Sequence, residues 1–134
     1  MPSMSRGVKN KNPLNIRIGN DWIGEVKKPT DPEFEQFTRM EYGIRAGFKI
    51  LRRYIQHHHR DTVAKIIQSW APASENDTES YISHVCALTG FSRDHMIFFE
   101  ERHTMVKLVS AMCRVECGTT ISTDIIETAY NMLL

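Results

Sequence analysis

Apolar residues recur at helical spacing in the middle of the chain. Beginning near residue 40, four of them follow one another at intervals of four, three and four residues, which puts them on one face of a helix: Ile44, Phe48, Leu51 and Ile55. This pattern predicts a helix from about Met40 to the histidine run at 57–59.

Further helices are marked by shorter apolar stripes together with residues that begin or end a helix. Asp, Ser and Thr favour the position before the first helical turn, Gly favours the position after the last one, and Pro cannot continue a helix. On these signals we predict five more helical segments: one that Asp61 caps and that stops before Pro72, one around Tyr81 that stops at Gly90, a short one that opens at Ser92, one from about Arg102 to Cys117, and a last one that Ser122 caps.

Gly and Pro interrupt the N-terminal quarter of the chain so often that no long helix fits there. Leu14, Ile16 and Ile18 alternate with polar residues, and a Gly-Asn pair follows at 19–20, which is typical of a strand that ends in a turn. We expect a small N-terminal β-hairpin that returns toward Trp22, or an irregular element in its place. The fold class is therefore mainly α, with about six helices and a small N-terminal α+β element.

Length and composition are those of one folded domain, residues 1–134. Hydrophobic residues make up 41% of the chain and charged residues 25%, a balance at which a soluble domain buries a modest core. No apolar run reaches the roughly 18 residues of a membrane span, and the stretch 1–12 is polar and basic without the apolar centre of a signal peptide. We expect synthesis in the cytoplasm without a signal peptide, no membrane partner, and free thiols, because three cysteines cannot all pair.

Charge is divided unevenly between the two halves of the chain. Residues 1–60 carry 12 Lys and Arg against 6 Asp and Glu, whereas residues 61–134 carry 5 against 10. Such halves can attract each other, or the basic half can bind an anionic polymer. A nucleic acid is not expected as a partner, because no element carries a basic stripe with interleaved aromatic residues.

The apolar stripe of the segment 102–117 ends in a carboxylate. Met105, Val109 and Met112 recur at intervals of four and three residues, and the next position on that face is Glu116. Removal of a carboxyl group from water favours its protonated form, which a general acid needs near neutral pH. Glu116 is therefore a candidate catalytic acid. The alternative is that the last helical turn frays and exposes it to solvent.

Polar and aromatic side chains near the N-terminus are suited to binding a sugar. The amides of Asn12 and Asn15 can hydrogen-bond to hydroxyl groups, and the indole of Trp22 can stack on a sugar ring. Glu75, in the loop after the Trp-Ala-Pro sequence at 70–72, offers a second carboxylate. Each of these residues has an ordinary structural alternative as a turn former, a core aromatic or a helix cap.

No metal and no cofactor are expected. The consecutive histidines at 57–59 point about 100° apart on a helix and cannot share one ion. Cys113 and Cys117 lie one helical turn apart, but the chain has no Cys-x-x-Cys pair, no His-Glu-x-x-His motif and no glycine-rich phosphate loop.

Several short motifs follow one another along the chain in a recognisable order. They are Arg-Gly-x-x-Asn-x-Asn-Pro-x-Asn-Ile-Arg at 6–17, Trp-x-Gly at 22–24, Trp-Ala-Pro at 70–72, Glu-Asn-x-Thr at 75–78, Tyr-Ile at 81–82 and Glu-x-Gly at 116–118. Over nearly its whole length the chain thus resembles a family of small phage virion proteins and prophage-encoded peptidoglycan hydrolases.

The resemblance implies a lysozyme-like domain, similar to lytic transglycosylases, that cleaves the MurNAc-GlcNAc β-1,4 bonds of peptidoglycan. It implies that Glu116 protonates the glycosidic oxygen, and that Asn12, Asn15 and Tyr81 correspond to the Asn-rich segment and the tyrosine of such domains. In those relatives the Glu-x-Gly motif comes first in the chain. We therefore expect a circularly permuted arrangement, in which the segment 102–117 packs beside the N-terminal segment and brings Glu116 to the cleft.

The resemblance leaves the type of reaction open. A transglycosylase needs one carboxylate, because the muramyl 6-hydroxyl attacks, whereas a hydrolase generally uses a second one, for which Glu75 or Glu25 is the candidate. The chain departs from the family pattern at two places: Val-Glu-Cys-Gly at 115–118 replaces His-Glu-Asn-Gly, and Leu14 stands where glycine is usual. The alternative is therefore a non-catalytic structural virion protein that keeps the lysozyme-like fold and binds glycan.

The resemblance also implies partners and a place of action. The expected partners are peptidoglycan glycan strands and other proteins of a virion or an injection device. The expected location is the virion, or the periplasm and cell wall after delivery.

Overall fold

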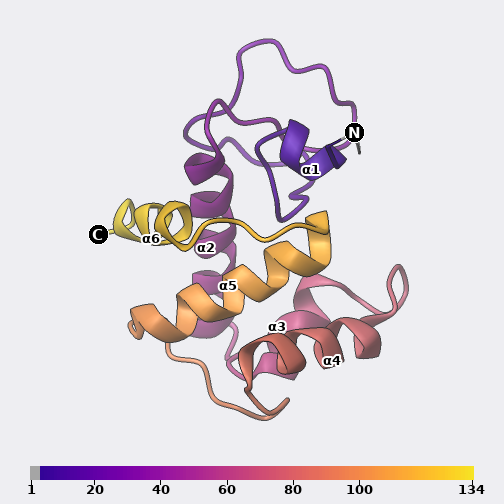
Figure 1. Cartoon of the computed structure of the whole chain (residues 1–134), viewed down its shortest axis with the longest axis vertical. Coiled ribbons are helices and arrows are strands. Elements are labelled where there is room, and N and C mark those ends of the chain that lie inside the picture. Colours follow the sequence, from indigo (N-terminus) through magenta and orange to yellow (C-terminus); the bar gives the residue numbers. More distant parts are fainter. Residues whose placement is uncertain (1–3) are drawn as a thin grey trace.

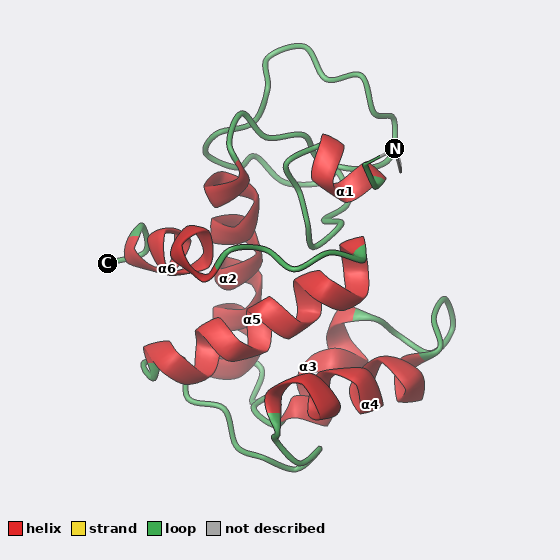
Figure 2. Ribbon diagram, viewed as in Figure 1, coloured by secondary structure: helices red, strands yellow, loops and turns green. Residues whose placement is uncertain are grey.

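The computed structural model describes residues 4–134 and consists of helices joined by loops (Figures 1 and 2). The helices are α1 (Arg6–Lys9), α2 (Met40–His57), α3 (Val63–Trp70), α4 (Thr78–Thr89), α5 (Arg102–Cys117) and α6 (Thr123–Asn131). Within the described residues β-pairing is limited to three isolated bridges. The prediction of a mainly helical fold with about six helices is confirmed, whereas the lysozyme-like fold stays a prediction. The first three residues, part of the polar stretch 1–12, lie outside the described residues.

Helix α2 is the central element of the fold. Its apolar face is buried as its spacing predicts, with Ile44, Phe48 and Leu51 fully inside the core. It packs against α6 and α3, while α5 crosses in front of it and packs against α4 and α6 (Figure 1). No helix formed by the described residues combines the length and the apolar character that a membrane crossing requires.

Most helix ends follow the predicted signals. Ser122 stands before the first turn of α6 as predicted, although its side chain makes no capping hydrogen bond. Gly90 and Gly118 end α4 and α5 in the left-handed conformation, with φ of 78° and 75°, which glycine adopts without strain. The residue that caps α3 is Thr62, whose hydroxyl accepts the N–H of Lys65 at 3.2 Å, and not Asp61. Asp61 instead lies in the segment before α3, where its carbonyl accepts the backbone N–H of Ile97 at 2.7 Å.

The short helix predicted to open at Ser92 is not present, and that prediction is wrong. The segment 92–97 makes a turn and then pairs with the start of α3, where the N–H of Ile97 donates to Asp61 and the N–H of Val63 donates to His95. These long-range partners satisfy backbone groups that a local helix would have used.

The predicted hairpin near the N-terminus is also wrong, and the irregular element expected in its place is present. Residues 16–18 pair with 33–35 and not with the segment around Trp22, through the N–H of Ile18 to Glu33 and the N–H of Glu35 to Ile16, both 3.0 Å. The chain makes a wide loop between these partners, which Figure 1 shows above α2. Helix α1, which the sequence pattern did not indicate, begins this segment.

A buried carboxylate holds the two ends of the wide loop together. Asp31 accepts two hydrogen bonds of 2.6 Å from the guanidinium of Arg6, one of 2.9 Å from Asn10, and the backbone N–H groups of Glu33 and Phe34. The bonds from Arg6 hold the pKa of Asp31 well below its usual range. The side chain of Asp31 thus ties α1 to the segment 31–37.

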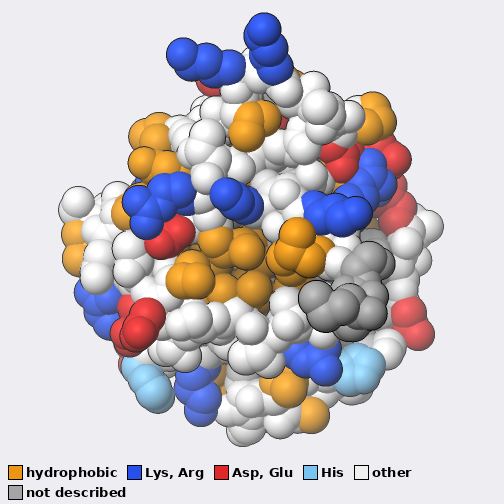
Figure 3. Space-filling view, turned by 45° about the horizontal axis from the view of Figure 1, so that its top comes forward, with side chains coloured by type: hydrophobic (Ala, Val, Ile, Leu, Met, Phe, Trp, Pro, Cys, Tyr) orange, Lys and Arg blue, Asp and Glu red, His pale blue; other side chains and the backbone are white. Residues whose placement is uncertain are grey.

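The two oppositely charged halves of the chain do not pair directly. Each of the five ion pairs formed within residues 4–134 joins residues of the same half, such as Arg6 with Asp31 and Arg93 with Glu79. On the face that Figure 3 shows, basic side chains surround an apolar area and acidic side chains lie among them. The excess of basic residues is therefore interrupted by acidic ones on that part of the surface.

The wide loop also contains a carboxyl pair. Glu35 is only 7% exposed and faces Glu25, and burial together with Glu25 raises the pKa of Glu35 to about 7, from an ordinary value of 4.5. The folded protein therefore keeps a proton that the unfolded chain has released between these two pH values. Stability consequently falls as the pH rises through this window.

Replacement of Glu35 by glutamine should raise the melting temperature by roughly 5 °C at about pH 8 and flatten its pH dependence. Glutamine has no charge to desolvate, and its amide can donate a hydrogen bond to Glu25. Thermal unfolding of both proteins between about pH 5 and pH 8 checks this, with the exposed Glu101→Gln exchange as the control. If the melting temperature of the variant fell with rising pH as steeply as that of the wild type, Glu35 would not be the responsible group.

Candidate active site

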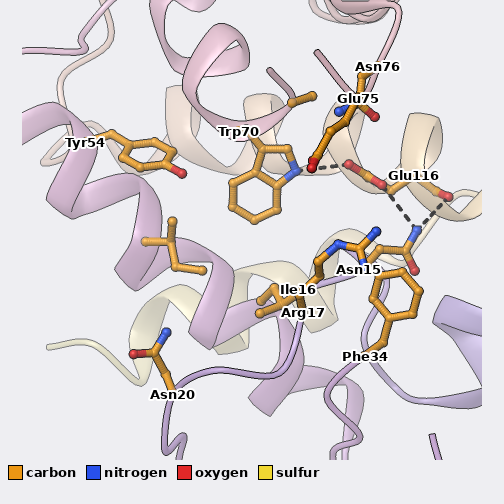
Figure 4. A pocket seen from close by; sticks show the side chains of 12 residues that line it. Asn15, Ile16, Arg17, Asn20, Phe34, Tyr54, Trp70, Glu75, Asn76 and Glu116 are labelled. Carbon is orange, nitrogen blue, oxygen red and sulfur yellow. Dashed lines mark hydrogen bonds between the residues drawn. The ribbon is translucent and has the colours of Figure 1, made fainter. Parts of the chain in front are cut away.

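Four separate parts of the chain meet around a cleft of about 400 Å³ (Figure 4). They are the N-terminal segment, the middle of α2, the loop that follows α3, and the last turn of α5. Twelve residues line the cleft: Asn15, Ile16, Arg17, Asn20, Phe34, Ile50, Tyr54, Trp70, Ala71, Glu75, Asn76 and Glu116. Amides, aromatic rings and two carboxylates thus face one hollow.

Glu116 lies at one end of this cleft and is held by three donors. The stripe that precedes it on α5 is buried as predicted, so the half-buried Glu116 extends that face to the rim of the core. Its carboxylate accepts the indole N–H of Trp70 at 3.0 Å, the hydroxyl of Tyr81 at 3.0 Å and the amide of Asn15 at 3.2 Å. These bonds fix the direction in which the carboxylate points, and Figure 4 shows the ones from Trp70 and Asn15.

Asn15 bridges the N-terminal segment and the end of α5. Its amide also donates to the backbone carbonyl of Glu116 at 3.1 Å, and its own backbone is left-handed, with φ of 53°, a conformation that asparagine tolerates. A β-carbon at Gly7 would come within 2.8 Å of the Asn15 side-chain oxygen. The glycine of the Arg-Gly motif therefore leaves space for this amide.

Asn12 is fully buried and lies outside the cleft lining. Its amide donates to the carbonyls of Ile16 and Glu35 at 2.9 and 3.0 Å, and its oxygen accepts the N–H of Ile16 at 3.0 Å. All of these bonds hold the turn that presents Asn15. We therefore reinterpret Asn12 as a positioning residue, in place of the substrate contact expected from the sequence.

Tyr81 and Trp70 both donate a hydrogen bond to the carboxylate of Glu116. Tyr81 is 8% exposed, and burial, followed by the charge of Glu116, raises the pKa of its hydroxyl, which therefore stays a neutral donor. Trp70 both lines the cleft and donates to Glu116. Trp70 was not among the residues expected to bind substrate, although its place in the Trp-Ala-Pro motif at 70–72 is a signal.

The other two carboxylates expected near the site lie in different surroundings. Glu75 lines the cleft on the exposed loop 72–77, and the side-chain hydrogen bonds formed within the described residues do not include its carboxylate. Capping of α4 falls to Asp77, which accepts the N–H of Ser80, so Glu75 is not needed as a cap. Glu25 faces Glu35 and does not line the cleft, and Trp22 lines an adjoining hollow.

The residues that depart from the family pattern do not face the cleft. Cys117 is buried beneath the end of α5, and Val115 is half-buried and outside the lining. Leu14 is fully buried where it meets Gly47 of α2, whose missing side chain leaves space for it. Neither departure places a side chain in the hollow.

The proposed packing of α5 beside the N-terminal segment is present, although the chain ends themselves are apart. Figure 1 shows α1 and the end of α6 on opposite sides of the molecule. The contact that matters for the cleft is the one between Asn15 and Glu116, which are 101 positions apart in the sequence. Among residues 4–134 no group of three or more His, Cys, Asp and Glu is placed to share a metal ion.

Comparison with known proteins gives one informative relationship. No family model matches the chain. The chain is similar to Protein P5 of Pseudoalteromonas phage PM2, with 42% identity over 119 residues that cover 86% of this chain and 72% of the relative. The similarity supports the prediction of a phage protein, and the name of the relative states no activity.

Proposed function

The chain belongs to the family of Protein P5 of Pseudoalteromonas phage PM2, and from this relationship and the cleft we propose that it is a virion-associated protein that cleaves the glycan strands of peptidoglycan. The relationship supports the phage part of this proposal. The catalytic part depends on the geometry around Glu116.

The observation that carries the catalytic proposal is the carboxylate of Glu116 at the end of a cleft, fixed by Asn15, Trp70 and Tyr81. Glycoside cleavage requires a general acid held beside the glycosidic oxygen, and in the proposed reaction the carboxyl group of Glu116 has this role. Protonated Glu116 donates its proton to the glycosidic oxygen as the bond from the muramyl C1 to that oxygen breaks.

The same side chain then completes the reaction. The muramyl 6-hydroxyl attacks C1 and forms the new C1–O6 bond, and the carboxylate of Glu116 takes up the hydroxyl proton. The acid is thereby regenerated and no water is consumed. We favour this transglycosylase reaction because Glu75, the second carboxylate of the cleft, is exposed and not held by a hydrogen bond within the described residues.

The remaining lining suits an amphipathic sugar chain. Asn20 and Asn76 offer amides to hydroxyl and acetamido groups, while Tyr54 and Trp70 offer aromatic surface to the apolar faces of sugar rings (Figure 4). A hollow of this kind, with few polar groups that converge on one acid, is typical of a ligand site.

Digestion of purified peptidoglycan, with mass spectrometry of the soluble products, tests the proposal. We expect fragments with 1,6-anhydromuramyl ends. Reducing ends would show a hydrolase instead, and the absence of soluble product would contradict the catalytic proposal.

Replacement of Glu75 by glutamine should lower the rate of product release by less than about tenfold and leave the anhydromuramyl ends unchanged. The reason is that the 6-hydroxyl, and not a water molecule activated by Glu75, attacks the muramyl carbon. Release of soluble fragments over time checks this, with Glu127→Gln on α6 as the matched carboxylate control. A rate near zero, together with reducing ends from the wild type, would assign Glu75 the role of second catalytic carboxylate.

A second candidate is a structural virion component that binds glycan in the cleft without cutting it. The relationship to a phage protein supports this role more directly than it supports catalysis, because the name of the relative points to a phage and states no activity. Co-sedimentation of the protein with peptidoglycan, without release of soluble fragments, is the result that would favour it.

A further inference from the structure

A second hollow, of about 690 Å³, continues the cleft along α2. It shares Asn20, Ile50 and Tyr54 with the cleft, so the two form one groove. The part beyond these shared residues is lined by Trp22, Lys49, Arg52, Arg53 and His57. One end of the groove thus has the acid Glu116, and the other end has a group of basic side chains.

This basic end is not neutralised by the protein itself. No acidic residue lines the second hollow, and none of the ion pairs formed within residues 4–134 involves Lys49, Arg52 or Arg53. The guanidinium of Arg52 lies 5.4 Å from the centre of the Phe99 ring. This cation–π contact gives Arg52 a structural role. Among residues 4–134, neither an aromatic ring nor a carboxylate is paired in this way with Lys49 or Arg53.

Lys49 and Arg53 are one helical turn apart on α2 and project to the same side of the helix. Like charges at this spacing disfavour the helix that carries them. Their presence at the groove is therefore better explained by an anionic ligand than by stability.

In peptidoglycan the anionic groups are the carboxylates of the stem peptides, which the muramyl residues carry on their lactyl groups. We propose that Lys49 and Arg53 bind stem-peptide carboxylates of a glycan strand that extends from Glu116 along the groove. This inference rests on the proposed function and makes its substrate more specific. The protein then prefers glycan strands that carry peptides over strands from which the peptides have been removed.

The double variant Lys49→Glu/Arg53→Glu tests this preference. Its substrates are purified peptidoglycan and the same glycan strands after an amidase has removed the stem peptides. Because the amidase leaves a free lactyl carboxylate on each muramyl residue, these carboxylates are converted to amides, and the resulting uncharged strands are the peptide-free form in every comparison. We expect cleavage of the peptide-bearing strands to be at least about tenfold slower than with the wild type, and cleavage of the stripped strands to stay within about twofold. An equal loss on both substrates, or a loss on neither, would overturn the proposal.

A matched control has the same change of charge outside the groove. Lys27 and Lys28 are exposed and do not line either hollow, so Lys27→Glu/Lys28→Glu should behave like the wild type on both substrates. Lys49 is half-buried, so a glutamate at this position is less well tolerated than a neutral side chain. The variant Lys49→Gln/Arg53→Gln therefore provides a second test, in which we expect cleavage of the peptide-bearing strands to slow by a smaller factor. Melting temperatures identify any variant that is not folded.

Binding separates a failure of this inference from a failure of the catalytic proposal. If the wild type cleaves neither substrate, catalysis fails, and titration calorimetry with soluble peptide-bearing muropeptides and with peptide-free glycan oligomers decides the inference. Tighter binding of the peptide-bearing form, lost in the double variant, supports it. Equal binding of both forms, or tighter binding of a duplex DNA oligonucleotide, overturns it.

Discussion

Exchange of Glu116 for glutamine should lower the release of glycan fragments by about a thousandfold or more and leave the protein folded. Glutamine has the size of glutamate, but its amide cannot give a proton to the glycosidic oxygen. Its oxygen can still accept the indole of Trp70 and the hydroxyl of Tyr81, while its amide nitrogen meets the amide of Asn15 and loses that bond. We therefore expect a small decrease in melting temperature together with the loss of activity.

The rate of appearance of soluble fragments, followed by mass spectrometry, measures this effect. Glu101→Gln provides the matched control, because it makes the same exchange at the other end of α5, on an exposed side chain. Co-sedimentation with peptidoglycan should be retained by Glu116→Gln, since the rest of the cleft lining is unchanged. Activity equal to that of the wild type would remove Glu116 from the role of acid.

Replacement of Gly43 by alanine should destabilise the fold by about 3 kcal/mol or more, a decrease of roughly 10 °C in melting temperature. Gly43 is buried on α2, where an added β-carbon would overlap the backbone carbonyl of Lys11. A backbone atom cannot move aside as a flexible side chain can, so the segment 11–15 would have to shift away from α2. This segment carries Asn15, and the cleft should therefore be disturbed as well.

Denaturant and thermal unfolding measure the expected loss. Gly47→Ala should cost less, because the atom that its β-carbon would meet is in the side chain of Leu14, which can rotate. Gly19→Ala is the neutral control, since no atom lies within 4 Å of its added β-carbon. If Gly43→Ala were as stable as Gly19→Ala, the close approach of the N-terminal segment to α2 would be contradicted.

The parts of the fold that the sequence predicted correctly depend on neighbouring residues. The spacing of apolar residues on α2 and α5, and the glycines that end α4 and α5, act within a few positions of each other. Some errors are local, such as the cap of α3 and the missed helix α1, but the two larger ones concern distant partners. The segment 16–18 pairs with 33–35, and the residues just before and at the start of α3 pair with 95–97. The periodicity of apolar residues does not determine these partners.

The candidate site divides in the same way. The place of Glu116 at the end of a buried stripe follows from the spacing of apolar residues alone. Its proximity to Asn15 was expected only from the family resemblance. The internal role of Asn12 could not be read from the sequence, because a buried amide and an exposed one have the same residue type. The indole of Trp70 reaches Glu116 from the end of α3, through an arrangement of helices that the sequence pattern leaves undetermined.

The bond between Asn15 and Glu116 joins residues that are 101 positions apart, and it has a consequence for how the protein is made. Closure of so long a loop is slow compared with the formation of single helices. A ribosome must release the end of α5 before the two residues can meet, so a nascent chain contains helices but no cleft. We expect the site to be among the last parts of the molecule to form.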